Sequence, residues 1–316
     1  MTAPMTLFRR LASASLIATI VLIAIGGLVR ATKSGLGCGT DWPHCGGRLV
    51  PALESRAAII EFSHRFTAGV VGFLILALAV VAVRRLHDER ELKVASVGAL
   101  ALVIFQALLG LAVVKAELER FVVVAHLVAA MSLLALLVYL AGMVAARTRG
   151  LDGVTDARLS RRIRLAALGV LALLVVGSLA STKDIASDSW PLVDGELVPD
   201  LGVEVFALHW LHRLHAGVVG IWVFSVAWSV IRRGREMPGA ARYAHAAAGL
   251  FGFEIFLGAL NLWTDLNAVV VALHLTTGAL IWASFAAMVT LTHPSVRAAS
   301  ESPARHAVPA MAEGGR

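Results

Sequence analysis

Four histidines occur in a pattern that suits the binding of two metal-centred cofactors. His64 and His126 in the first half of the chain return in the second half as His212 and His274, both at an offset of 148 residues. Each stands early in a long apolar segment, where an ionisable side chain is costly to bury and usually functional. Two imidazoles at one depth on facing helices suit the two axial positions of a heme iron. We therefore expect two heme sites rather than four separate interhelical hydrogen bonds made by histidine.

One acidic residue breaks the symmetry between the two halves. Glu61 precedes His64 by three residues and lies on the same helix face, whereas the matching position in the second half is His209. A carboxyl group beside a bound heme suits a general acid or base, or a group that stabilises developing positive charge. The structural alternative is that Glu61 hydrogen-bonds a neighbouring helix or pairs with Arg65. We predict that the first half carries out chemistry and that the second holds a permanent redox heme.

Other polar residues accompany the histidines. Arg65 and Arg213 directly follow two of them and either bind heme propionates or extend their side chains to the membrane interface. Gln106 and Glu254 occupy a matched polar position, where they are either packing contacts or groups that support the heme ligands.

The two cysteines of the chain, Cys38 and Cys45, lie in the loop before the second apolar segment. The compartment expected for this loop permits disulfides. A structural disulfide that caps the first half is our default expectation. A redox-active pair that exchanges electrons with the first heme site is the sharper alternative.

The elements that must position these residues are membrane-spanning helices. The chain of 316 residues is 58% hydrophobic and 16% charged, with a mean hydropathy of +0.80. Its apolar residues fall in runs long enough to cross a bilayer, which excludes a soluble enzyme and a disordered or fibrous chain. We predict eight spans, at about residues 8–30, 58–83, 94–114, 122–146, 163–182, 206–231, 244–263 and 269–292.

The excess of basic residues indicates orientation in the membrane. The net charge is +7, and 19 of the 28 Lys and Arg residues fall on the side of the N-terminus, against 6 on the other side. This distribution follows the positive-inside rule with both termini in the cytoplasm, so it gives no reason to expect nucleic-acid binding. The first span is long for a signal peptide, and we expect it to be retained. We expect the chain in the plasma membrane, in contact with membrane lipid.

An internal repeat organises the spans. The same offset matches Trp42-Pro43 with Trp190-Pro191 and Gly110 with Gly258. Because each unit has four spans and the same orientation, we expect an all-α integral membrane protein with two tandem four-helix bundles, related by a pseudo-two-fold axis along the membrane normal. The expected domains are a catalytic bundle at residues 1–148, a second-heme bundle at 149–292 and a disordered cytoplasmic tail at 293–316.

Together these features resemble the heme A synthase family. The resemblance rests on Glu-x-x-His-Arg at residues 61–65, the histidines at 126, 212 and 274, the eight spans in two repeats and the Cys-x6-Cys loop. It covers nearly the whole chain through about residue 292. The family oxidises the C8 methyl group of heme O to a formyl group through a hydroxylated intermediate, which gives heme A for heme-copper oxidases. The resemblance implies this reaction here, with a heme O synthase as the functional partner.

The resemblance also implies a role for each candidate residue. His64 and His126 would hold the substrate heme O, with Glu61 as the essential acidic group beside it. His212 and His274 would ligate the iron of a heme b cofactor. The cysteine pair of the first outer loop is matched, whereas the second pair that many bacterial relatives carry in the third outer loop has no counterpart here.

Two other classes of protein share part of this pattern. A di-heme b-type electron-transfer protein, similar to a quinol oxidoreductase, would use the same four histidines but would not need Glu61 in one half only. A transporter is often built from duplicated bundles, but it predicts no bound heme and usually has broken helices at the midplane. The unmatched carboxyl group therefore favours the enzyme.

Overall fold

The described part of the chain is mainly helical. The computed structural model describes residues 3–51, 55–149, 153–181 and 190–301. Its long helices are α1 (Ala3–Ala31), α2 (Arg56–Arg85), α3 (Arg90–Lys115), α4 (Arg120–Arg149), α5 (Ala157–Ala180), α6 (Glu204–Ile231), α7 (Pro238–Trp263) and α8 (Ala268–Leu291). All eight are long and apolar enough to cross a membrane. The predicted all-α class with eight spans is confirmed, and the protein is a multi-pass membrane protein.

Two helices begin about six residues before the predicted spans. α5 begins at Ala157 and α7 at Pro238, against predicted starts at residues 163 and 244. Asp156 caps α5 by accepting hydrogen bonds from the backbone N–H groups of Arg158 and Leu159. Proline fits the first turn of α7 because a backbone N–H there would have no partner within the helix. Apolar runs mark only the part of a helix inside the bilayer, so they miss these polar ends.

The segment after α8 differs from the predicted loose tail in its first residues. Pro294–Glu301 forms a short helix, α9, which again begins with proline. Val296 is buried against the core, and the Ser295 hydroxyl donates a hydrogen bond to Oε1 of Glu91 at 2.5 Å. These contacts order residues that the composition alone assigned to the tail. The rest of the expected tail, residues 302–316, lies outside the described residues.

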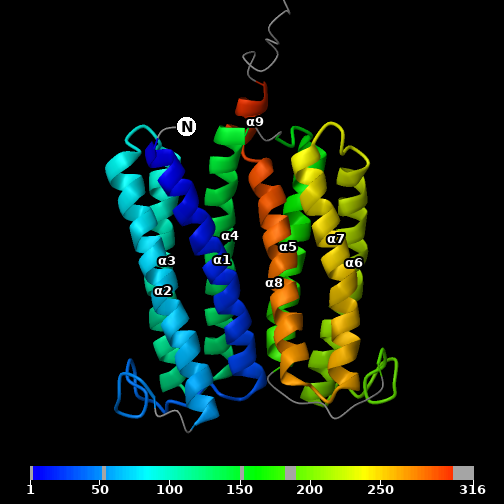
Figure 1. Cartoon of the computed structure of the whole chain (residues 1–316). Coiled ribbons are helices and arrows are strands. Elements are labelled where there is room, and N and C mark those ends of the chain that lie inside the picture. The colour runs from blue at the N-terminus through cyan, green and yellow to red at the C-terminus, as the bar shows by residue number, and fades with distance from the viewer. Residues whose placement is uncertain (1–2, 52–54, 150–152, 182–189, 302–316) are drawn as a thin grey trace, which may run out of the picture.

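The eight long helices form two groups of four that lie side by side (Figure 1). α1 and α3 each pack against both α2 and α4, so the first four helices close a ring. α5 to α8 close a second ring through the corresponding contacts. α2 and α4 are therefore diagonal partners across the first ring, as are α6 and α8 across the second. A pseudo-two-fold axis between the rings, and a separate role for each ring, stay predictions.

The two rings meet along α1, α4 and α8 near the centre of the molecule (Figure 1). Small residues allow close approach there, since a Cβ added at Gly27 would lie 3.3 Å from the Cα of Ala272. A Cβ added at Gly142 would lie 2.9 Å from Cγ2 of Thr290. Close backbone packing of this kind drives helix association in a bilayer, because apolar side chains gain little by leaving lipid. The two rings are thus held together by direct helix contact.

The two ends of the helices differ. One end, here called the arginine-rich side, holds the start of α1 and the short helix α9 (Figure 1). Arg233 forms an ion pair of 2.6 Å with Asp156 on this side. That guanidinium and the backbone N–H groups at the start of α5 lower the pKa of Asp156 to about 2. The opposite end, here called the loop side, carries the long connections that contain Trp42 and Trp190. Which side faces the cytoplasm stays a prediction.

Candidate active site

All four repeat-matched histidines line one cavity. Its volume is about 2360 Å³, and residues of both rings line it, among them His64, His126, His212 and His274. The two Trp-Pro pairs at 42–43 and 190–191 also line it. Most of the remaining wall is aliphatic or aromatic, as in sites that bind a largely apolar ligand. The structure thus brings together candidate residues from α2, α4, α6 and α8.

The histidines form two pairs, one in each ring of helices. His64 and His126 are close enough for their charges to interact, and so are His212 and His274. Each pair comes from the diagonal helices of one ring, so each pair spans the interior of that ring. A planar macrocycle placed between two such imidazoles takes one axial ligand from each face.

Each histidine ring packs against a glycine of a neighbouring helix. A Cβ added to these glycines would lie close to Cε1 of the imidazole: 3.1 Å for Gly26 and His64, 3.4 Å for Gly110 and His126, 2.9 Å for Gly177 and His212, and 3.6 Å for Gly258 and His274. At Gly177 an added Cβ would lie too close to the imidazole unless that ring moved, whereas at Gly258 it would make an ordinary contact. The sequence does not indicate these glycine contacts, although Gly110 and Gly258 are a matched pair of the repeat.

The imidazole nitrogens are suited to ligate an iron in the cavity. Nδ1 of each of the four histidines is buried and has no hydrogen-bond partner within the described residues. With Nδ1 inside the protein and Cε1 against a glycine, Nε2 is the nitrogen that remains to face the cavity. Neutral imidazole is a usual axial ligand of heme iron. The residues present therefore fit two hemes, each held by one histidine pair.

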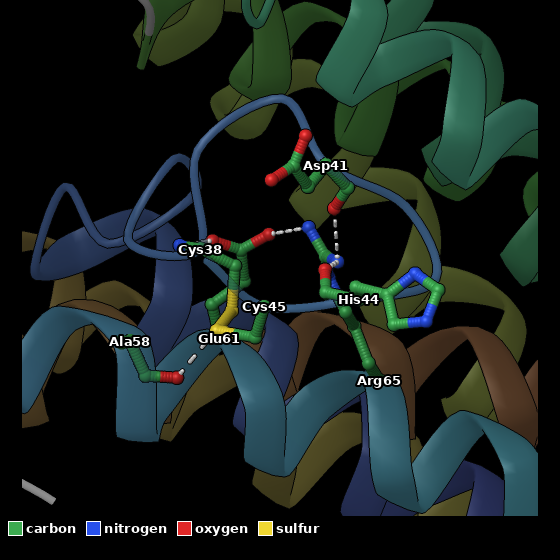
Figure 2. A network of polar contacts seen from close by, with 7 residues as sticks. All are labelled: Cys38, Asp41, His44, Cys45, Ala58, Glu61 and Arg65. Carbon is green, nitrogen blue, oxygen red and sulfur yellow. Dashed lines mark hydrogen bonds and ion pairs between the residues drawn. A yellow bond between two sulfur atoms is a disulfide. The ribbon is translucent and has the colours of Figure 1, made fainter. Parts of the chain in front are cut away.

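Glu61 lies in the cavity wall on the loop side, one turn from His64. Its side chain is buried, with 3% of the residue exposed. Oε2 accepts a hydrogen bond of 2.8 Å from the backbone N–H of Cys38, and Oε1 pairs with the guanidinium of Arg65 (Figure 2). The pairing with Arg65 was the structural alternative raised from the sequence. The catalytic role of Glu61 stays a prediction, which its position beside the histidine pair supports.

The two arginines bind the loops that cover the cavity. Arg65 donates hydrogen bonds of 2.9 Å to the backbone carbonyls of Asp41 and His44 (Figure 2). Arg213 donates to the carbonyls of Pro191 and Leu192 in the corresponding connection of the second ring. Each arginine thus fixes the loop that carries its own Trp-Pro pair. The sequence did not predict this role, and contact with heme propionates stays a prediction for both residues.

Cys38 and Cys45 form a disulfide, which confirms the predicted bond. Both cysteines are buried and pack with Ala58 and Phe62 of α2. The bond closes the loop directly above Glu61, since the N–H of Cys38 is the donor to that carboxylate (Figure 2). The disulfide therefore fixes the loop that covers the first histidine pair.

The matched polar position on α3 and α7 supports the histidines of α4 and α8. Nε2 of Gln106 donates a hydrogen bond of 2.9 Å to the backbone carbonyl of His126. Oε1 of Glu254 lies 3.3 Å from Nδ1 of His274, so here the contact is with the imidazole itself. A carboxylate behind a ligating histidine fixes its orientation and raises its basicity. The same repeat position thus supports the backbone in one ring and the ligand in the other.

Comparison with known proteins identifies relatives over most of the chain. Residues 9–286 match the family described as Cytochrome oxidase assembly protein. Several similar proteins are named Heme A synthase. That of Geobacillus kaustophilus is 31% identical over 279 residues, which cover 83% of this chain and 84% of the relative. That of Listeria monocytogenes is 28% identical over 268 residues, with 82% and 87% covered. That of Alkalihalophilus pseudofirmus is 31% identical over 224 residues, with 68% and 74% covered.

Proposed function

Because this chain belongs to the Cytochrome oxidase assembly protein family, we propose that it is a heme A synthase, an oxidoreductase that converts heme O to heme A. The reaction oxidises the C8 methyl group of the substrate to a formyl group. One observation carries the proposal, namely two histidine pairs in a single cavity, with a buried glutamate, Glu61, one turn before the first histidine and a histidine, His209, at the matching position of the second ring. The names of the relatives do not favour the di-heme electron-transfer alternative.

The first ring holds the substrate. His64 and His126 bind heme O from opposite faces, and Gly26 and Gly110 fix the orientation of the two imidazoles. Oxidation of a single methyl substituent requires that the macrocycle cannot rotate, because other methyl groups would otherwise reach the same position. Two axial ligands, with the closed loop above them, supply that restraint.

Glu61 acts on protons released from the substrate. Oxidation of a methyl group releases protons, and the Glu61 carboxylate lies in the wall of the same cavity. The Cys38 N–H and the Arg65 guanidinium hold it in one orientation. A positioned carboxylate can accept a proton or stabilise positive charge that develops on the macrocycle.

The second ring holds heme b. Bound between His212 and His274, heme b would supply one-electron redox chemistry. Gly177 and Gly258 seat the two imidazoles, and Glu254 fixes the ring of His274. Because the second ring has no carboxylate at the position of Glu61, we assign it to the resident cofactor and the first ring to the substrate.

The cellular setting follows from this chemistry. The substrate comes from a heme O synthase, and the product serves heme-copper oxidases. The distribution of Lys and Arg supports an orientation in the plasma membrane with both termini in the cytoplasm and the loop side, with its disulfide, outside.

The proposed function is tested by heme extraction and mass analysis from cells that make heme O, with and without this chain. We expect heme A, or its hydroxylated precursor, only in cells that carry the chain. Unchanged heme O together with heme b on the purified protein would support the electron-transfer alternative instead.

A further inference from the structure

The cavity reaches deeper in the first ring than in the second. On α2 its lining continues to Leu76, twelve residues past His64, whereas on α6 it ends at Gly217, five residues past His212. At about 1.5 Å per helical residue, these depths are about 18 Å and about 8 Å beyond the histidines. The extra depth runs toward the arginine-rich side.

Two phenylalanine side chains fill the corresponding space among α5 to α8. Phe251 on α7 packs directly on Gly220 of α6, where an added Cβ would lie 2.7 Å from its Cε1. Phe224 contacts Phe251 edge to face, with the ring centroids 5.8 Å apart. Phe251 is only 2% exposed. The cavity of the second ring therefore ends at this aromatic pair.

Smaller residues stand at the matched positions of the first ring. The offset of 148 residues pairs Val103 with Phe251, Leu76 with Phe224 and Gly72 with Gly220. Val103 and Leu76 line the cavity, and a Cβ added at Gly72 would meet nothing within 4 Å. The volume that the Phe251 and Phe224 side chains fill in the second ring of helices is therefore open in the first ring of helices.

The walls of this extension are apolar and reach the outer surface of the helices. Past Arg65 on α2 the lining residues are all apolar or glycine, and Phe73 among them is 73% exposed. Ile104 of α3 also lines the cavity and is 56% exposed. These residues lie within the spans, so the extension has an apolar route to lipid between α2 and α3.

We propose that this extension, lined by Gly69, Gly72, Phe73, Leu76, Val103 and Ile104 and here called the tail channel, binds the long isoprenoid tail of the substrate heme. The inference rests on the proposed function, because heme O carries such a tail and heme b does not. The propionates and the tail leave opposite edges of the macrocycle, so propionates on the polar loop side direct the tail into the channel. In the second ring the Phe251 and Phe224 pair excludes a tail, which restricts that site to heme b.

The test introduces into the tail channel a phenylalanine side chain, which the second ring of helices already has at the matched position. Purified protein that retains heme b is titrated with heme O and, separately, with tail-less protoheme IX, in the wild type, Val103→Phe and Val97→Phe. Val97 is a matched control, because it lies on α3 and is 48% exposed but does not line the cavity. Retained heme b reports that each variant is folded, and Leu76→Phe replaces Val103→Phe if that variant loses heme b.

We expect Val103→Phe to weaken binding of heme O about tenfold, within the range that overfilling a packed site produces. Binding of protoheme IX should stay unchanged, and Val97→Phe should affect neither heme. Unchanged binding of heme O to Val103→Phe would overturn the tail channel and indicate that lipid acyl chains occupy it. Equal loss of both hemes would also overturn it, since the pocket as a whole would then be damaged. A wild type that neither binds nor oxidises heme O would refute the proposed function itself.

Discussion

The Glu61 carboxylate connects three parts of the first ring. It accepts the N–H of Cys38 in the disulfide loop and pairs with Arg65, which in turn binds the loop carbonyls of Asp41 and His44. Glu61 is therefore part of the anchor that holds the loop over the first histidine pair.

Loop anchoring alone does not explain why a carboxylate is there. In the second ring Arg213 holds its loop through the carbonyls of Pro191 and Leu192, and His209 stands where the first ring has Glu61. An arginine thus suffices to bind the loop in one ring. The additional carboxylate of the first ring is explained by our proposal that the reaction takes place in that ring.

Glu61→Gln should lower heme A formation by about 10²- to 10⁴-fold, the usual contribution of a positioned acid or base. Glutamine keeps an oxygen that accepts the Cys38 N–H, so the loop should remain in place. The measurement is heme A formed per purified protein, with the optical spectrum of the second heme as the control for folding. Undiminished formation would remove Glu61 from the chemistry and leave it as a loop anchor.

Glu254→Ala should reduce retention of heme b by roughly 10- to 100-fold, as loss of a group that orients a metal ligand commonly does. The reason is that Oε1 of Glu254 lies 3.3 Å from Nδ1 of His274. Heme b content after dialysis checks this. Gln106→Ala is the matched control, since Gln106 donates to the backbone carbonyl of His126 in the first ring and its loss should leave heme b content at the wild-type level.

At the scale of helices, each of the four candidate ligand histidines packs against a glycine of the helix beside it. The seats differ in tightness, from 2.9 Å at Gly177 to 3.6 Å at Gly258. Separations under 3.0 Å leave no room for a methyl group unless the imidazole moves, whereas 3.6 Å is an ordinary contact. We therefore expect opposite results for an alanine substitution at Gly177 and at Gly258, the two glycines that contact the second histidine pair.

Gly177→Ala should displace the ring of His212 and lower heme b content roughly tenfold, while Gly258→Ala should leave it unchanged. Alanine favours a helix over glycine at both sites, so the comparison isolates the contact with the imidazole. The heme b spectrum of the two purified variants measures the effect. Equal heme content in both would show that the glycines do not seat the ligands.

The sequence predicted the helices and the candidate ligands but not the glycines against which the four histidines pack. Apolar runs located all eight spans, and one offset found the histidine pairs. The same offset aligns Gly26 with Leu174, because Gly26 precedes His64 by 38 residues and Gly177 precedes His212 by 35. A comparison at fixed spacing therefore misses this pair, and only packing between α1 and α2 or α5 and α6 shows its role.

Arg65 and Arg213 illustrate a second limit of the sequence. Their positions after the histidines indicated either propionate contact or extension to the membrane interface. In the structure their guanidinium groups bind loop carbonyls, and these loops follow no helical or strand period that a sequence pattern could detect. The direction of a long side chain depends on the tertiary contacts of the loop that it meets.

At the scale of the whole molecule, the internal repeat gives two similar rings of helices. In our account, residue differences at matched positions give each ring a separate function. In our proposal Glu61 gives the first ring a group for chemistry, and small residues such as Val103 leave that ring a deeper cavity. Phe251 closes the second ring, and Glu254 supports its ligand. Residues of both histidine pairs line one cavity, so our proposal gives the substrate and the cofactor a shared space.

The division of work between the rings is tested most directly by the heme content of two matched variants, His126→Ala and His274→Ala. These histidines occupy the same repeat position, so each variant removes one ligand from one ring. The purified proteins are compared by heme extraction and by their optical spectra. Our account predicts that His274→Ala loses heme b, whereas His126→Ala retains heme b but forms no heme A. Wild-type heme b in His274→Ala, or its loss only in His126→Ala, would contradict the account.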